Sequence, residues 1–129
     1  MAKILVVEDD VSLRNMYQLM LEDAGYEVTT AESGEVALAI AEEQQFDLLI
    51  ADIVLPGMDG VELMKRLVDG SVAMRAIAIS GGAPQIKQVF GRADLSDSKL
   101  SERISIISKP VEMPFLLAAV KSSLKNELE

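Results

Sequence analysis

The chain has 129 residues, half of them hydrophobic, which is enough for one buried core and too little for two ordinary domains. Its 21 acidic and 12 basic side chains give a net charge of −9, which disfavours direct binding to nucleic acids and anionic lipids. Cysteine and histidine are absent, which excludes disulfides, thiolate or imidazole metal sites, and histidine-based catalysis. We therefore expect one domain over residues 1–129 whose chemistry uses carboxylates, hydroxyls and lysine.

The first ten residues, MAKILVVEDD, contain one basic residue and only four consecutive apolar residues before the acidic ones. That run is too short for a signal peptide or a membrane span. We expect a cytoplasmic protein that does not contact the membrane.

Short apolar runs recur along the chain and predict strands. Four of them are nearly continuous, as in parallel strands that are buried on both faces. A fifth segment, residues 26–31, alternates more and predicts an edge strand. The four continuous runs are residues 4–7, 48–51, 76–79 and 104–107.

The segments between these strands show the apolar spacing of helices that cover a sheet. Asp10 and Ser33 are suited to cap the first two helices, and Gly25 is suited to end the first. The predicted apolar stripes are Leu13, Met16, Met20 and Ala24; Ala37, Ile40 and Ala41; Val61, Met64, Leu67 and Val68; and Met113, Leu116, Leu117, Val120 and Leu124.

The alternation of strands and helices predicts an α/β fold, a doubly wound five-stranded parallel sheet with helices on both faces. The expected strand order is 2-1-3-4-5, as in flavodoxin-like folds. Residues 81–103 leave two alternatives open, because a helix could begin at Pro84 or lie later, over residues 96–103.

Polar residues stand where the predicted strands end. Glu8 and Asp9 follow the first strand, Asp52 ends the third, Ser80 ends the fourth and Lys109 ends the fifth. A doubly wound sheet places its ligands outside the carboxyl ends of its strands, so these five residues should meet at one edge.

Crowded carboxylates repel each other and are stabilised by a hard cation. Oxygen ligands without histidine or cysteine favour Mg²⁺. An aspartate beside Mg²⁺ and a lysine can attack a phosphoryl group, since both cations offset the charge of its oxygens. Each residue alone is more often a helix cap, a turn former or a solvated lysine. Their conjunction predicts an aspartyl-phosphate site.

Four segments resemble the response-regulator receiver domain of two-component signalling, of the chemotaxis-regulator type. They are ILVVEDD, LLIADIVLPGMDG, AIS and IISKP, and the similarity runs from Lys3 to about Asn126. The resemblance implies that Asp52 is the phosphoacceptor. It also implies Mg²⁺ ligands from the side chains of Glu8, Asp9 and Asp52 and from the backbone carbonyl of Val54.

The same resemblance implies that Lys109 contacts the phosphoryl group, that Ser80 is the switch hydroxyl, and that the Lys109–Pro110 peptide is cis. The implied donor is a sensor histidine kinase or a histidine phosphotransfer protein. The implied output is binding to a downstream protein target, with a phosphorylation-dependent homodimer left open. Such a domain assists its own phosphorylation and dephosphorylation but is not an enzyme in the usual sense.

Three features depart from the family pattern. Ile106 stands where the family has an aromatic residue, which puts output through a rotating ring in doubt. The segment from Ser80 to Lys109 is several residues longer than usual. Val54, two residues after Asp52, is apolar and cannot orient an attacking water, so we expect slow loss of the phosphate.

Three other functions compete. A phosphatase of the haloacid-dehalogenase type would need a second aspartate at position 54, which is Val54 here. A flavin protein would need more aromatic residues than the three Phe and two Tyr present. A degenerate receiver that binds its partner without phosphorylation is the remaining alternative.

Overall fold

The computed structural model describes residues 1–69, 74–81 and 103–128. Within these ranges five strands form one parallel sheet in the order β2-β1-β3-β4-β5, which confirms the predicted topology. The edge position of the second strand is also confirmed. The strands are β1 (Lys3–Val7), β2 (Glu27–Ala31), β3 (Leu48–Asp52), β4 (Arg75–Ser80) and β5 (Ile104–Ser108).

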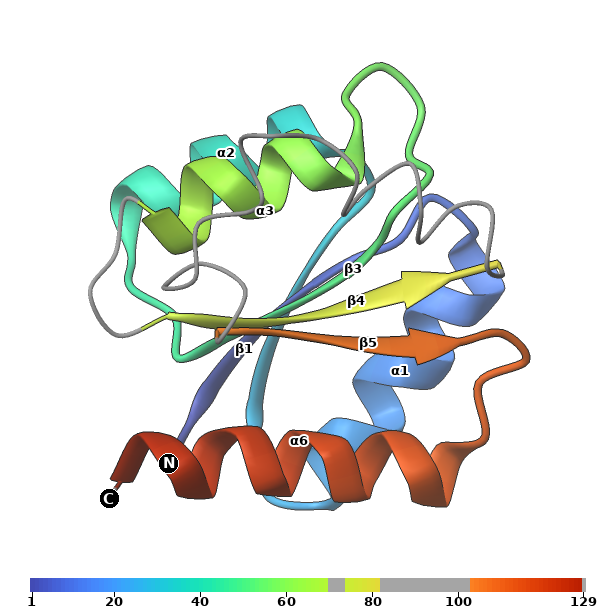
Figure 1. The fold of residues 1–129 in the computed structure, drawn as a ribbon, viewed down its shortest axis with the longest axis vertical. Helices are drawn as coiled ribbons and strands as arrows, with labels where there is room; N and C mark the ends of the chain where they lie inside the picture. Colours follow the sequence, from blue (N-terminus) through green and yellow to red (C-terminus); the bar gives the residue numbers. More distant parts are fainter. Residues whose placement is uncertain (70–73, 82–102, 129) are drawn as a thin grey trace.

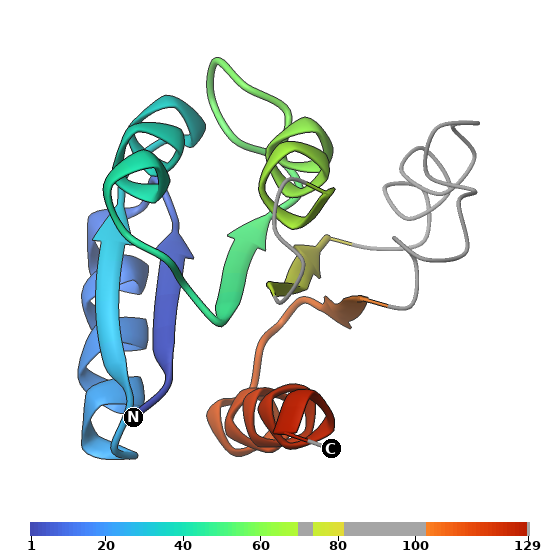
Figure 2. The same ribbon diagram turned by 90° about the vertical axis from the view of Figure 1, so that its left-hand side faces the viewer.

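Helices cover both faces of the sheet, as the sequence predicts. α2 and α3 lie together on one face, while α1 and α6 lie on the other (Figures 1 and 2). None of the described helices is both long enough and apolar enough to cross a membrane. The helices are α1 (Val11–Asp23), α2 (Gly34–Glu43), α3 (Gly60–Asp69) and α6 (Met113–Leu128).

Two buried clusters account for the continuous apolar runs. Successive strand residues point to opposite faces of the sheet, and both faces are covered here. In β1, Leu5 and Val7 belong to the cluster that contains residues of α2 and α3. Ile4 and Val6 belong to the cluster that contains residues of α1 and α6.

The buried face of α1 matches the prediction in part, since Leu13 and Met20 are partly buried and pack against the core. Tyr17 and Leu21 are its buried residues, whereas Met16 is 41% exposed and Ala24 is exposed just after the last helical residue, Asp23. Leu13, Tyr17 and Leu21 are spaced by four, which is as compatible with a helix as the predicted stripe. The sequence of α1 is apolar on more than one side, so periodicity alone does not identify the face that packs on the sheet.

The predicted helix caps are confirmed. The Asp10 carboxylate accepts a hydrogen bond from the Leu13 amide at 3.0 Å, and the Ser33 hydroxyl accepts one from the Val36 amide at 3.2 Å. Gly25 follows α1 with φ +101°, a left-handed conformation that suits glycine. Residues 82–102 lie outside the described part of the chain, so the two alternative helices there stay predictions.

Candidate phosphoacceptor site

The register of the parallel strands brings the predicted site residues to one edge. Val7 pairs with Ala51, so Glu8 comes next to Asp52. Ser80 pairs with Ser108, which directly precedes Lys109. The arrowheads of β4 and β5 point to this same side of the molecule (Figure 1).

Asp52 is the last residue of β3 and is only 5% exposed. Its Oδ2 lies 2.6 Å from Lys109 Nζ, and its Oδ1 accepts a hydrogen bond from the Val54 amide at 3.0 Å. A buried carboxylate requires such partners, because an unpaired buried charge is strongly unfavourable. The Asp52 side chain is therefore fixed by contacts to both of its oxygens.

Lys109 reaches Asp52 from the residue after β5. Its amide donates a hydrogen bond of 2.7 Å to the Ser80 carbonyl, which fixes its backbone beside the end of β4. The hydrogen bond to Asp52 raises the pKa of the Lys109 ammonium, burial partly opposes this, and the charges of Asp52, Glu8 and Asp9 add to it. Lys109 is therefore a charged group aimed at Asp52. The Lys109–Pro110 peptide is cis, as predicted.

Glu8 is buried and Asp9 is exposed, although both follow β1. Burial raises the pKa of Glu8, and a hydrogen bond with Asp9 and the charges of Asp52 and Asp9 raise it further. A hydrogen bond of 3.1 Å from the Asp10 amide to Glu8 Oε2 acts in the opposite direction. The negative charges of Asp9 and Asp52 therefore both act on Glu8.

This group of carboxylates fits a hard divalent cation such as Mg²⁺. All the side-chain donors are oxygens, and an added positive charge would offset the negative charge gathered around Glu8. Among the residues described, no three acidic side chains already form a metal-binding cluster. Glu8 Oε2 instead accepts the hydrogen bond from Asp10, and both Asp52 oxygens contact other residues.

The loop after β3 is held close to the strand by a glycine. The Gly60 amide donates a hydrogen bond of 3.0 Å to the Ile53 carbonyl. A Cβ at Gly60 would lie 2.7 Å from the Ile53 carbonyl oxygen and would also clash with the Asp52 carbonyl oxygen. The start of α3 can therefore approach the end of β3 only because residue 60 has no side chain.

The other predicted residues also lie near this edge. Ser80 is the fully buried last residue of β4, and Val54 is 58% exposed just beyond Asp52. Ile106, at the position of the expected aromatic residue, is half-buried and packs on the side of the sheet that α2 and α3 cover.

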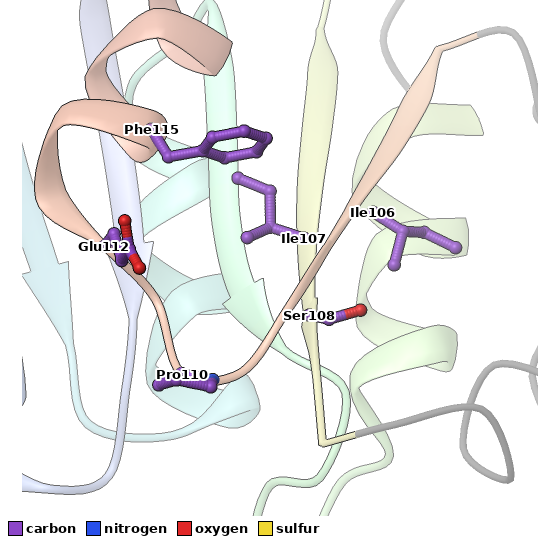
Figure 3. A pocket seen from close by; sticks show the side chains of 6 residues that line it. All are labelled: Ile106, Ile107, Ser108, Pro110, Glu112 and Phe115. Atoms are coloured by element: carbon purple, nitrogen blue, oxygen red, sulfur yellow. The ribbon is translucent and has the colours of Figure 1, made fainter.

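A cavity of 510 Å³ lies where β5 leads into α6. Ile107 and Phe115 point toward one another there, whereas Ile106 and Ser108 point to the other side of the strand (Figure 3). Phe115 is 66% exposed, which is unusual for a large aromatic side chain. The cavity is lined by Ile106, Ile107, Ser108, Pro110, Glu112 and Phe115.

Tyr17 was not singled out from the sequence, yet the charges of the site act on it. Its phenol is buried in the face of α1 that packs on the sheet. Burial raises its pKa from 10.0 to about 12, and the negative charges of Glu8 and Asp52 contribute. The folded protein therefore holds the phenol proton more tightly than the unfolded chain does.

This pKa predicts part of the alkaline stability. From the unfolded value of 10.0 up to about 12, the unfolded state loses the Tyr17 proton while the folded state keeps it, so stability falls as the pH rises. Tyr17→Phe keeps the ring and removes this proton. Urea unfolding from about pH 9 upward should show a smaller loss of stability in Tyr17→Phe than in the wild type. Equal losses in both proteins would show that the phenol does not contribute.

The strand order and the charged groups at the carboxyl ends together characterise a signalling domain of the two-component type. The family model that matches is the response regulator receiver domain, over residues 4–121, and the chain belongs to this family. Receiver domains act with histidine kinases and downstream effectors in two-component systems.

Relatives cover nearly the whole chain. The alkaline phosphatase synthesis transcriptional regulatory protein PhoP of Bacillus subtilis is 33% identical over an alignment of 134 positions, gaps included. The alignment covers 97% of this chain and 54% of PhoP. The chain thus spans about half the length of that relative. The chemotaxis protein CheY4 of Vibrio cholerae has a solved structure with a TM-score of 0.79 and 33% identity, covering 96% of this chain and 99% of that one. TrrA of Thermotoga maritima, solved in complex with Mg²⁺-BeF, has a TM-score of 0.74 and 27% identity, covering 96% and 100%.

Proposed function

We propose that this chain is a single receiver domain over residues 1–129 that accepts a phosphoryl group on Asp52 with the help of Mg²⁺. The observation that carries the proposal is the buried carboxylate of Asp52 at the end of β3, with its Oδ2 2.6 Å from the Lys109 ammonium. Family membership and the TrrA complex with Mg²⁺-BeF support the same chemistry.

Each residue has a defined part in this reaction. An oxygen of Asp52 attacks phosphorus, and the bond from phosphorus to the donor nitrogen breaks with its electron pair leaving on that nitrogen. Lys109 offsets the negative charge of the phosphoryl oxygens. The buried Ser80 hydroxyl would move toward the site and donate a hydrogen bond to one of these oxygens. Glu8, Asp9, Asp52 and the Val54 carbonyl would hold Mg²⁺, which supplies further charge compensation when bound.

The test of this function is the intact mass of the protein after incubation with acetyl phosphate. We expect one phosphoryl adduct in the presence of Mg²⁺ and none after chelation with EDTA. A protein that binds Mg²⁺ but gains no adduct from acetyl phosphate or from a histidine phosphotransfer protein would favour the degenerate receiver.

The exposed side chain of Val54 predicts a long-lived phosphoryl group. An isopropyl group cannot hydrogen-bond the water that would attack the acyl phosphate, so hydrolysis should be slow. Val54→Asn should shorten the lifetime, measured by mass after the phosphodonor is removed, whereas Leu19→Asn on the exposed face of α1 should not. A wild-type lifetime of seconds would contradict this prediction.

The proposed partners and cellular location follow from the same phosphotransfer chemistry. A sensor histidine kinase or a histidine phosphotransfer protein would supply the phosphoryl group in the cytoplasm, and a protein target would respond to it. The cavity at the start of α6 and the exposed ring of Phe115 make that side a candidate contact surface for the target. A homodimer that forms on phosphorylation is an alternative output, which sedimentation of the phosphorylated protein would detect.

A further inference from the structure

Arg14 reaches back from the first turns of α1 to the turn that follows β1. Its Nη1 donates a hydrogen bond of 2.8 Å to the carbonyl oxygen of Glu8 and a longer one of 3.5 Å to that of Asp9. The guanidinium therefore binds the backbone of the two acidic residues and not their carboxylates. A charged donor makes such bonds stronger than those of a neutral side chain.

The same turn is fixed by a small network of other bonds. The Asp10 amide donates to Glu8 Oε2 at 3.1 Å, and the Asp10 carboxylate accepts from the Leu13 amide at 3.0 Å. The Arg14 amide donates to the Asp10 carbonyl at 2.9 Å. Arg14 thus contributes both a backbone and a side-chain bond to the segment that carries Glu8 and Asp9.

We propose that Arg14 is a positioning residue that sets the direction of the Glu8 and Asp9 carboxylates for Mg²⁺. This inference rests on the proposed function, because the two carboxylates are its proposed Mg²⁺ ligands. Arg14 acts through the peptide groups of Glu8 and Asp9, so it is not a catalytic residue. Without the guanidinium, the carbonyls of Glu8 and Asp9 lose their bonds to α1, and the two carboxylates lose part of their preset orientation.

Positioning and simple electrostatics predict opposite results for removal of this charge. A guanidinium beside a cation site repels the cation, so its loss would tighten Mg²⁺ binding if Arg14 acted only through charge. If Arg14 positions the ligands, its loss weakens binding, and groups that orient metal ligands typically contribute about 10-fold to 100-fold in affinity. The sign of the change therefore separates the two roles.

The experiment compares Arg14→Gln, Arg14→Lys and the control Arg66→Gln with the wild type. Arg66 lies in the last turn of α3, where its side chain is exposed and pairs with Glu62 at 3.0 Å. Arg66→Gln thus makes the same chemical change away from the β1–α1 turn. Mg²⁺ affinity is measured by calorimetric titration, and the hydrogen exchange of the Asp10 amide is measured by NMR in metal-free protein.

We expect Arg14→Gln to bind Mg²⁺ about 10-fold more weakly and to exchange the Asp10 amide faster, with Arg66→Gln unchanged. Arg14→Lys keeps a charge and one donor, so it should recover part of the loss, and it replaces Arg14→Gln if that variant does not fold. Equal or tighter Mg²⁺ binding by the folded variant, with unchanged exchange, would overturn the inference. If the wild type itself binds no Mg²⁺, the proposed metal site is wrong. The hydrogen-exchange rates of the Asp10 amide then still show whether Arg14 stabilises the turn between β1 and α1.

Discussion

Asp52→Asn should abolish the phosphoryl adduct while leaving the protein folded. The amide oxygen of asparagine can still accept the hydrogen bond from the Val54 amide, which holds Oδ1 in the wild type. It cannot act as the nucleophile, because an amide oxygen does not form a stable acyl phosphate. The expected result is no mass increase with acetyl phosphate and Mg²⁺, and an unchanged circular dichroism spectrum.

The matched control for this prediction is Asp23→Asn, which removes an exposed carboxylate at the end of α1. This variant should gain the adduct at the wild-type rate. An adduct of equal yield in Asp52→Asn would mean that another carboxylate accepts the phosphoryl group, and the assignment of the site would be wrong.

Lys109→Gln should slow phosphorylation by about 100-fold, the usual order for loss of one donor that contacts developing charge. In the structure the Lys109 ammonium contacts Asp52 Oδ2, so it is in place to meet an incoming phosphoryl oxygen. The rate of adduct formation, followed by mass against time, measures this effect. The free energy of unfolding should also fall, because Lys109→Gln leaves the buried Asp52 carboxylate without its positively charged partner, so the rates are compared on protein shown to be folded.

Lys109→Arg separates charge from geometry. A guanidinium keeps the positive charge but is broader and planar, so it should restore only part of the rate. Lys65→Gln, on α3, removes a lysine charge elsewhere and serves as the control. A phosphorylation rate for Lys109→Gln within about 3-fold of the wild type would contradict the role assigned to the ammonium.

The strands could be predicted from the sequence because burial on both faces leaves a distinct pattern. Residues 48–51 read as a continuous apolar run, and all of them are buried. The buried face of α1 could be predicted only in part, because Met16 and Tyr17 are both apolar enough to pack and only contact with the sheet decides between them.

The site shows the same division between what strand order determines and what side chains determine. The strand order alone brings Asp52, Ser80 and Lys109 to one edge, so the sequence was sufficient to predict their meeting. It did not indicate the bonds of Arg14 to the carbonyls of Glu8 and Asp9, because a long arginine side chain on a helix can reach many backbone carbonyls and, unlike a helix cap, has no fixed position for its partner. The effect of the site on Tyr17 likewise depends on how α1 is rotated.

The most direct test of the central claim is to locate the phosphoryl group in the wild-type protein. Reduction of the acyl phosphate with borohydride converts the modified aspartate to homoserine, and peptide mass spectrometry then identifies its position. We predict homoserine at residue 52 alone, and only when Mg²⁺ is present during phosphorylation. Homoserine at another aspartate, or an equal yield without Mg²⁺, would contradict the proposed site.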